Sequence, residues 1–394
     1  MEREFTESKC STDGTLVQRS VLVVAIALML VAGGAALGAG AHSTSASAST
    51  PKVVYYVAMG DSLAAGVGAN LTTNGYVDQV YRHELARYPG LRLVNLSCSG
   101  ATTQSVIGGG GCSYSTGSQL GDAESFLQAH PGQVAFLTMD IGTNDVDGCI
   151  QKSGIDASCI QGGVGHVSTE LPEILGGLAG SYAGLVIYGM DYYDPYLASW
   201  LTGPDGRALA QQSETQTVEF NALLGQIYHA AGIAMADPAT LFKTTDLAPT
   251  GAYLGTRVPQ NVSVICSWTL MCSEHNIHPD DGGHAALALS VEQVIDHVAV
   301  TTTELPPASV GVAYGAPLNA VGGIPAYRWS LATKSDPLPP GLHLEGSGTI
   351  TGVPRSRGSY ALTVQVVDQQ ATTTTTTTPP TTRSASESLS LTVR

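Results

Sequence analysis

Short apolar runs alternate with longer helical patterns between residues 53 and 300. The apolar runs have the length of buried strands and are followed by turn residues; they cover residues 53–59, 91–96, 134–142, 184–190 and 232–237. Apolar residues recur at helical spacing over residues 76–88, 168–180, 215–232 and 283–299, and the intervening segment 203–213 is predicted to be a loop. This alternation predicts an α/β domain with helices on both faces of a parallel sheet.

The pattern changes after residue 300, where helical periodicity disappears and Pro, Gly and β-forming residues dominate. Runs such as YRWSL, GTITG and YALTVQVVD predict the short strands of a small all-β sandwich. A threonine-rich segment, residues 371–383, interrupts this region, and its polar repeat predicts a disordered loop. We therefore expect two domains, residues 50–300 and residues 301–394.

Residues 1–49 form a region of their own. Arg19 precedes a long apolar run that ends in small residues, and a short polar linker follows. This order is typical of a secretory signal peptide cleaved after Ala41, although a run of this length also fits an uncleaved membrane anchor. Both interpretations predict that the rest of the chain is secreted or held at the cell surface.

The net charge argues against one class of binding partner. Only 12% of the 394 residues are charged, and 32 acidic residues outweigh 17 basic ones, for a formal net charge of −15. A nucleic-acid-binding surface needs a basic patch that displaces counterions, so this balance argues against a nucleic-acid partner.

Cysteine spacing fits an exported protein. Apart from Cys10 in the N-terminal region, six cysteines remain, and they lack the CxxC pattern of a zinc site. They fall along the chain as three close pairs, which favours three disulfides, with buried free thiols as the alternative. The predicted pairs are Cys98–Cys112, Cys149–Cys159 and Cys266–Cys272.

The first motif with candidate catalytic residues is Gly-Asp-Ser at residues 60–62, directly after the first predicted strand. A serine at this position is exposed at the carboxyl end of the strand. The N-terminus of a following helix would favour negative charge developing nearby. The alternative is that Asp61 or Ser62 merely caps that helix.

Three other segments supply matching groups. Gly100 follows the second predicted strand and Asn144 the third, while His278 precedes the last predicted helix. Sites in parallel sheets form at the carboxyl ends of the strands, so we expect these groups to lie near Ser62. A nucleophile, two hydrogen-bond donors and a base are what acyl transfer requires.

These four segments resemble the ordered sequence blocks of the GDSL, or SGNH, hydrolases, a family of esterases and lipases. The resemblance covers about residues 53–298 and is closest to the secreted actinobacterial branch. It implies a three-layer, flavodoxin-like fold and no cofactor. Ser62 would be the nucleophile and His278 the general base, and the oxyanion hole would use Ser62, Gly100 and Asn144. From about residue 305 onward, the chain resembles the Ig-like domains of bacterial surface and secreted proteins.

The family pattern Asp-x-x-His places an aspartate at position 275, where this chain has His275. A second imidazole cannot supply the negative charge that stabilises an imidazolium. Three substitutes stay open: the backbone carbonyl of His275, the side chain of Glu274, and a carboxylate from Asp280, Asp281 or elsewhere.

His275, His278 and His284 also raise the question of a metal site. Pro279 and the Gly282–Gly283 pair interrupt the segment, and a fourth ligand with suitable spacing is lacking. We therefore predict no metal here and expect His284 to pack or cap within the last helix.

Three functions are compatible with the sequence. The first is a secreted serine esterase or lipase that hydrolyses small-molecule or lipid esters. The second is a carbohydrate acetyl esterase, suggested by the Ig-like domain, which would contact a polysaccharide or cell surface. The third is a non-catalytic surface-binding protein with a degenerate hydrolase site, suggested by the missing aspartate at position 275.

Overall fold

The structure is a computed structural model that describes residues 53–151, 153–322, 327–368 and 383–394. The predicted signal or anchor segment and nearly all of the threonine-rich segment lie outside the described residues. Within the described residues, no helix combines the length and the apolar character needed to cross a membrane.

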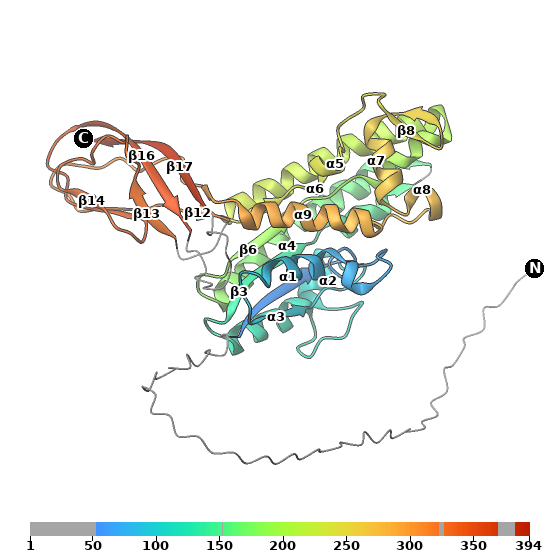
Figure 1. Cartoon of the computed structure of the whole chain (residues 1–394), viewed down its shortest axis with the longest axis horizontal. Coiled ribbons are helices and arrows are strands. Elements are labelled where there is room, and N and C mark those ends of the chain that lie inside the picture. The colour runs from blue at the N-terminus through green and yellow to red at the C-terminus, as the bar shows by residue number, and fades with distance from the viewer. Residues whose placement is uncertain (1–52, 152, 323–326, 369–382) are drawn as a thin grey trace, which may run out of the picture. The chain divides into compact units, whose positions relative to one another are not determined.

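A five-stranded parallel sheet organises the first domain (Figure 1). Its order is β2-β1-β3-β6-β7, and the register of each neighbouring pair is parallel. The strands are β1 Val54–Gly60, β2 Leu91–Asn95, β3 Val134–Asp140, β6 Ile187–Met190 and β7 Ala234–Ala236, which confirms all five predicted strands. The chain order reverses between β1 and β3, and open α/β sheets bind ligands at such a switch point.

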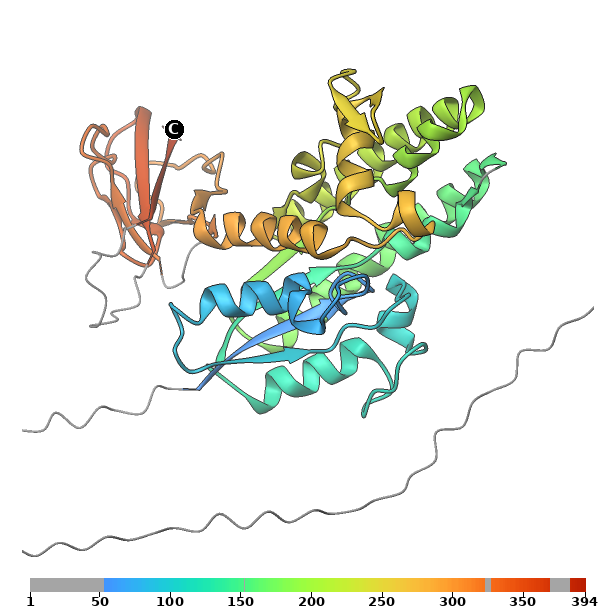
Figure 2. The same cartoon turned by 45° about the vertical axis from the view of Figure 1, so that its right-hand side comes forward.

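Five helices form the outer layers of the domain. The two helices α1 Tyr76–Glu84 and α9 Asp281–Asp296 pack against each other, as both views show (Figures 1 and 2). The other layer contains α3 Gln119–Ala129, α4 Ala157–Ser181 and α5 Pro204–Ala230. With the sheet between them, these helices give the predicted three-layer α/β fold.

The prediction of a loop over residues 203–213 is wrong. These residues form the first turns of α5, which begins at Pro204. The Gly-Pro-Asp-Gly sequence resembles a turn, but proline is well suited to the first position of a helix because its fixed φ is helical and its missing N–H would be unpaired there anyway.

Short elements connect these layers. Two small hairpins are β4 Ile150–Gln151 with β5 Gly154–Ile155, and β8 Gly251–Tyr253 with β9 Thr256–Val258. The short helices are η1 Thr72–Asn74, α2 Thr103–Gly108, η2 Thr143–Asp145, η3 Asp147–Cys149, η4 Pro195–Thr202, α6 Pro238–Leu241, α7 Gln260–Trp268 and α8 Met271–Glu274.

All three predicted disulfides are present: Cys98–Cys112, Cys149–Cys159 and Cys266–Cys272. The paired cysteines lie 14, 10 and 6 positions apart, in segments that follow β2, β3 and β7 along the chain, so each disulfide closes a short loop. A disulfide in such a loop stabilises the fold mainly by limiting the conformations of the unfolded chain.

The second domain is the predicted all-β sandwich. Its sheets are antiparallel: β11 Tyr314–Pro317, β15 Thr349–Gly352 and β14 Leu342–Leu344 form one, and β13 Arg328–Leu331, β16 Gly358–Val367 and β17 Ser384–Val393 form the other. A further pair joins β10 Ala299–Val300 to β12 Ala320–Val321. Alternate residues of β16, Leu362, Val364 and Val366, are buried beside Trp329 and Ile350, as expected for a strand with one face in the core.

Helix α9 offers a matched test of this packing. Leu287 is 0% exposed and Leu289 is 46% exposed on the same helix. We expect Leu287→Ala to lower the free energy of unfolding by about 2–5 kcal/mol, because it leaves a cavity in the core. We expect Leu289→Ala to change it by less than about 0.5 kcal/mol. Urea unfolding of both variants measures this, and equal losses would contradict the packing described.

Candidate active site

Ser62 lies in a tight turn that follows β1. Residues 61–67 are not a regular helix, contrary to the expectation from sequence; they form consecutive turns closed by Ala65 N–H to Asp61 O and Val67 N–H to Ser62 O. The Ser62 residue is 6% exposed. The Asp61 side chain accepts from the N–H of Leu63 (2.9 Å), which fixes the turn around the serine.

The end of β1 is held by a buried side chain. Gln119 donates from Nε2 to Gly60 O (3.0 Å) and accepts at Oε1 from Gly60 N–H (2.8 Å). Gly60 has φ 140°, and a Cβ there would lie 2.4 Å from Asp140 O, so only glycine fits beside β3. The strand end that carries Ser62 is therefore fixed in place.

The segment after Ser62 packs directly on the loop that carries His278. A Cβ on Gly68 would lie 2.2 Å from Pro279 O and 3.0 Å from His278 Cβ, so the two backbones are in close contact. This contact brings a loop after the first strand next to a loop before the last helix.

The first turn of α9 clamps the same segment. His284 is fully buried; its Nδ1 accepts from Tyr76 N–H (3.3 Å), so its Nε2 carries the proton and donates to Val67 O (3.0 Å). Burial lowers the pKa of His284, which agrees with a neutral ring, although the bond to Val67 opposes the shift. The prediction that His284 packs within the last helix is confirmed.

Asp281 completes the clamp. Its carboxylate accepts from the backbone N–H of Asn70 (2.8 Å) and from the side-chain amides of Asn70 and Asn74 (2.9 Å each). Asp281 thus binds the segment that follows Ser62, and Asp280 caps α9 by accepting from Gly283 N–H (2.9 Å).

The three groups expected to bind an oxyanion lie on the segments that follow β1, β2 and β3. Asn144, in η2 after β3, donates from Nδ2 to Ala101 O (2.9 Å), next to Gly100. Gly100 adopts φ 78° in the loop after β2. Within the described parts of the chain, the backbone N–H groups of Ser62 and Gly100 have no protein acceptor.

His278 lies in the loop between α8 and α9. Burial lowers the pKa of His278, and the charge of Asp147 opposes that shift. Its Nδ1 lies 2.6 Å from Asn276 Oδ1, and its backbone N–H donates to the same oxygen (3.1 Å). Asn276 did not stand out in the sequence; the available signal was an Asn two residues before the histidine, a spacing that allows a side-chain turn.

The two substitutes proposed near position 275 occupy other places. Glu274 is exposed at the end of α8, and His275 caps that helix in the left-handed conformation, with φ 56°. Among the described residues, neither the Glu274 carboxylate nor the His275 carbonyl hydrogen-bonds to His278.

Ser62, Asn144 and His278 line one cavity of about 240 Å³. Gly100 does not line it. The walls are mainly apolar or aromatic, from Leu63, Val146, Ile150, Ile160, Val164, Tyr192, Tyr193, Tyr196, Phe220, Leu223 and Ile277. Asp147, Asp194 and Glu219 also line the cavity, and Asp147 accepts from the Tyr196 hydroxyl (2.6 Å).

A buried pair of carboxyl groups, Asp61 and Asp140, lies directly beneath the turn that contains Ser62. Asp140 accepts from the Tyr76 hydroxyl and from Ala64 N–H, and Asp61 accepts from the Tyr192 hydroxyl (3.1 Å). Burial raises the pKa of Asp61 to about 6, and burial together with the Asp61 charge raises the pKa of Asp140 well above its usual range. Burial and the mutual repulsion of two close carboxylates therefore favour a protonated carboxyl in this pair.

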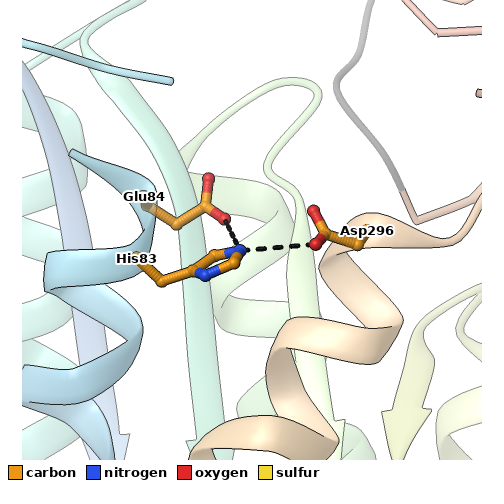
Figure 3. A group of neighbouring side chains, drawn as sticks. All are labelled: His83, Glu84 and Asp296. Carbon is orange, nitrogen blue, oxygen red and sulfur yellow. Dashed lines mark hydrogen bonds and ion pairs between the residues drawn. The ribbon is translucent and has the colours of Figure 1, made fainter. Parts of the chain in front are cut away.

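One group in the described residues has the composition of a metal site, and it lies elsewhere, on α1 and α9 (Figure 3). It contains His83, Glu84 and Asp296. Arg87 already pairs with both carboxylates, with contacts of 3.1 Å to Glu84 and 2.7 Å to Asp296. Although burial opposes it, hydrogen bonds from His83 and Arg87 lower the pKa of Asp296 to about 2. The cluster is an ion-pair network that joins two helices.

Comparison with family models agrees with this geometry. The model of the GDSL-like Lipase/Acylhydrolase family matches residues 58–286, more than half of the chain. The chain belongs to this family. A second model, for an Ig domain, matches residues 297–393. A comparison with curated proteins finds no match.

Solved structures of GDSL hydrolases are similar but distant. The lipase Lip_vut3 from a goat rumen metagenome is 18% identical, with a TM-score of 0.44, over 61% of this chain and 97% of its own. An extracellular lipase from Streptomyces rimosus is 19% identical, with a TM-score of 0.41, over 61% and 99%. A two-domain esterase active on acetylated mannans is 13% identical, with a TM-score of 0.34, over 61% and 49%.

The buried acid pair predicts a pH dependence of stability. The pKa of Asp61 is about 6 in the folded chain, above its unfolded value of about 3.9. A raised pKa means that its contribution is fully present below about pH 4 and is lost as the pH rises through about 6. A shift of this size corresponds to roughly 1–3 kcal/mol.

We expect Asp61→Asn to remove this part of the pH dependence, because asparagine resembles the protonated carboxyl and does not titrate. Urea unfolding at several values between pH 4.5 and 7.5 measures it. Asp336→Asn, at an exposed position of the second domain, is the control and should keep the wild-type slope. An unchanged slope in Asp61→Asn would contradict the assignment.

Proposed function

We propose that this GDSL-family protein is a serine esterase that hydrolyses carboxylic esters through an acyl-enzyme on Ser62. The observation that carries the proposal is that Ser62, Asn144 and His278, from three distant parts of the chain, line one cavity. A non-catalytic surface-binding role is less well supported, because a degenerate site would not need all three groups at one cavity.

In the proposed first step, Ser62 Oγ attacks the ester carbonyl carbon while His278 takes the hydroxyl proton. The tetrahedral intermediate then collapses: the bond from carbon to the alcohol oxygen breaks, and His278 returns the proton to the leaving alcohol. In the second step, water attacks the carbonyl carbon of the Ser62 ester while His278 takes a proton from the water. The bond from that carbon to Ser62 Oγ then breaks, His278 returns the proton to Oγ, and the carboxylic acid and free serine are released. No cofactor takes part in this scheme.

The oxyanion that forms in both steps needs donors already in position. The unpaired N–H groups of Ser62 and Gly100 and the Asn144 amide are the candidates. Asn144 Nδ2 carries two hydrogens, so one remains available while the other bonds to Ala101 O. Losing a single donor of this kind typically costs about 10²–10³-fold in turnover.

The cavity supports an ester with an apolar acyl chain. Its volume of about 240 Å³ is far more than an acetyl group needs, and its walls include Ile150, Ile160 and Val164. The Cys149–Cys159 disulfide supports two of these walls, since each cysteine directly precedes one of the isoleucines. These features favour a short- to medium-chain fatty ester over a polysaccharide acetyl ester.

We further propose that the protein acts outside the cytoplasm. Three disulfides support this location, because structural disulfides persist in oxidising compartments. A role of the Ig-like domain in contacting a cell surface or polysaccharide is part of the same proposal.

Ester hydrolysis tests the proposal directly. We expect wild-type protein to hydrolyse p-nitrophenyl butyrate, and we expect Ser62→Ala and His278→Ala each to lose at least about 10³-fold in kcat. Chelators should have no effect. Retention of full activity in Ser62→Ala, with a circular dichroism spectrum matching the wild type, would exclude the mechanism.

Acyl-chain preference tests the role of the cavity. We expect p-nitrophenyl esters of four to eight carbons to exceed the acetate in kcat/KM, because burying each methylene contributes about 0.8 kcal/mol. Val164→Phe should fill the cavity and move the optimum to shorter chains while preserving acetate hydrolysis. Val218→Phe makes the same change at a position on α5 that is 44% exposed, and it should leave the optimum unchanged. A preference for acetylated xylan or mannan over all fatty esters would favour the acetyl esterase.

A further inference from the structure

The base loop contains an orienting group that is not an acid. His278 Nδ1 lies 2.6 Å from Asn276 Oδ1, where a Ser-His-Asp site would have a carboxylate. We propose that Asn276 is the positioning residue of His278, so that the site is a Ser62–His278–Asn276 triad with a neutral third member. This inference rests on the function proposed above and specifies how its base is held.

The backbone fixes which end of the Asn276 amide faces the ring. The N–H of His278 can only donate, and it contacts the same Asn276 atom at 3.1 Å, so that atom is the acceptor Oδ1. An acceptor facing Nδ1 requires Nδ1 to carry the ring proton. Nε2 of neutral His278 is then unprotonated, which is the tautomer that a general base for Ser62 needs.

The loop holds Asn276 in this position from several sides. Leu270 N–H donates to His278 O (3.0 Å) and Asp280 N–H to Trp268 O (3.0 Å), so the loop folds back on the end of α7. The Tyr193 hydroxyl donates to Ile277 O (2.7 Å), and the Cys266–Cys272 disulfide ties α7 to α8. Asn276 is consequently ordered by contacts other than its bond to His278.

The left-handed conformation of His275 explains why Asn276, and not residue 275, takes the place of the expected aspartate beside His278. With φ 56°, His275 ends α8 and turns the chain, so the next residue, Asn276, provides the side chain that reaches His278. The acceptor has moved from three residues before the base to two.

Charged groups near His278 do not take over this role. The acidic residues Asp147, Asp194 and Glu219 line the same cavity as His278. The first turn of the neighbouring helix α9 contains Asp281 and His284. Asp147 and Asp194 already accept from the Tyr196 hydroxyl and the Ser213 hydroxyl, and Asp281 binds Asn70. On the loop itself, Glu274 and His275 are exposed and Asp280 caps α9.

A neutral amide orients the ring and selects its tautomer, but it adds no full negative charge to stabilise an imidazolium. We therefore expect Asn276→Leu, which has a similar size, to lower kcat on p-nitrophenyl butyrate at least about tenfold with little change in KM. Asn276→Asp should retain substantial activity and move the acidic limb of the kcat/KM profile upward by about one pH unit, because a carboxylate raises the pKa of the base. Ser273→Ala, exposed on α8, is the matched loop control and should behave like the wild type.

Ring ¹⁵N chemical shifts of histidine-labelled protein provide a readout that needs no turnover. We expect neutral His278 to be the Nδ1–H tautomer in the wild type and in Asn276→Asp, and to shift toward Nε2–H in Asn276→Leu. A wild-type Nε2–H tautomer would overturn the proposal. So would an unchanged pH profile in Asn276→Asp, or a loss of activity in Glu274→Gln that Asn276→Leu does not share. If the wild type hydrolyses no ester, the proposed function fails, and the tautomer still decides the role of Asn276.

Discussion

The close contact between the Ser62 turn and the His278 loop is the constraint on which the rest of the site depends. Gly68 lies so near Pro279 and His278 that a single Cβ would not fit between them. The two loops are about 210 residues apart in the sequence, so their contact depends on the fold of the sheet between them. His284 and Asp281, in the first turn of α9, hold this contact through backbone and amide groups of residues 67–76.

The polar groups beneath the site act mainly by holding the Ser62 turn in position and less by adding charge to the site. Gln119 holds both backbone groups of Gly60, and the buried pair of Asp61 and Asp140 links the ends of β1 and β3 to buried tyrosine hydroxyls. A buried polar network of this kind is stable only when its members are paired, and pairing makes it rigid. The Ser62 turn is thus supported from below by hydrogen bonds and from the side by α9.

Much of this arrangement could be predicted from the sequence, because strands buried in a parallel sheet are nearly continuous apolar runs and the long helices have clear periodicity. Nearby cysteines likewise suggested the correct disulfides. The sequence did not predict the helical start of α5 at Pro204, since Gly-Pro-Asp-Gly also suits a turn. Nor did it predict the contact of Asn276 with His278. The left-handed conformation of His275 decides which side chain faces His278, and the conformation of one loop residue leaves no periodic signal in the sequence.

The neutral third member fits the rest of the site. A carboxylate at Asn276 would add negative charge to a cavity already lined by Asp147, Asp194 and Glu219, in a chain with a net charge of −15. With an amide instead, burial lowers the pKa of His278 and favours the neutral ring, which is the form that can accept a proton. In the proposed mechanism, the cost is a weaker stabilisation of the imidazolium, so more of the catalysis would come from the oxyanion donors. The proposed mechanism therefore depends on orientation and donor placement more than on a buried acid.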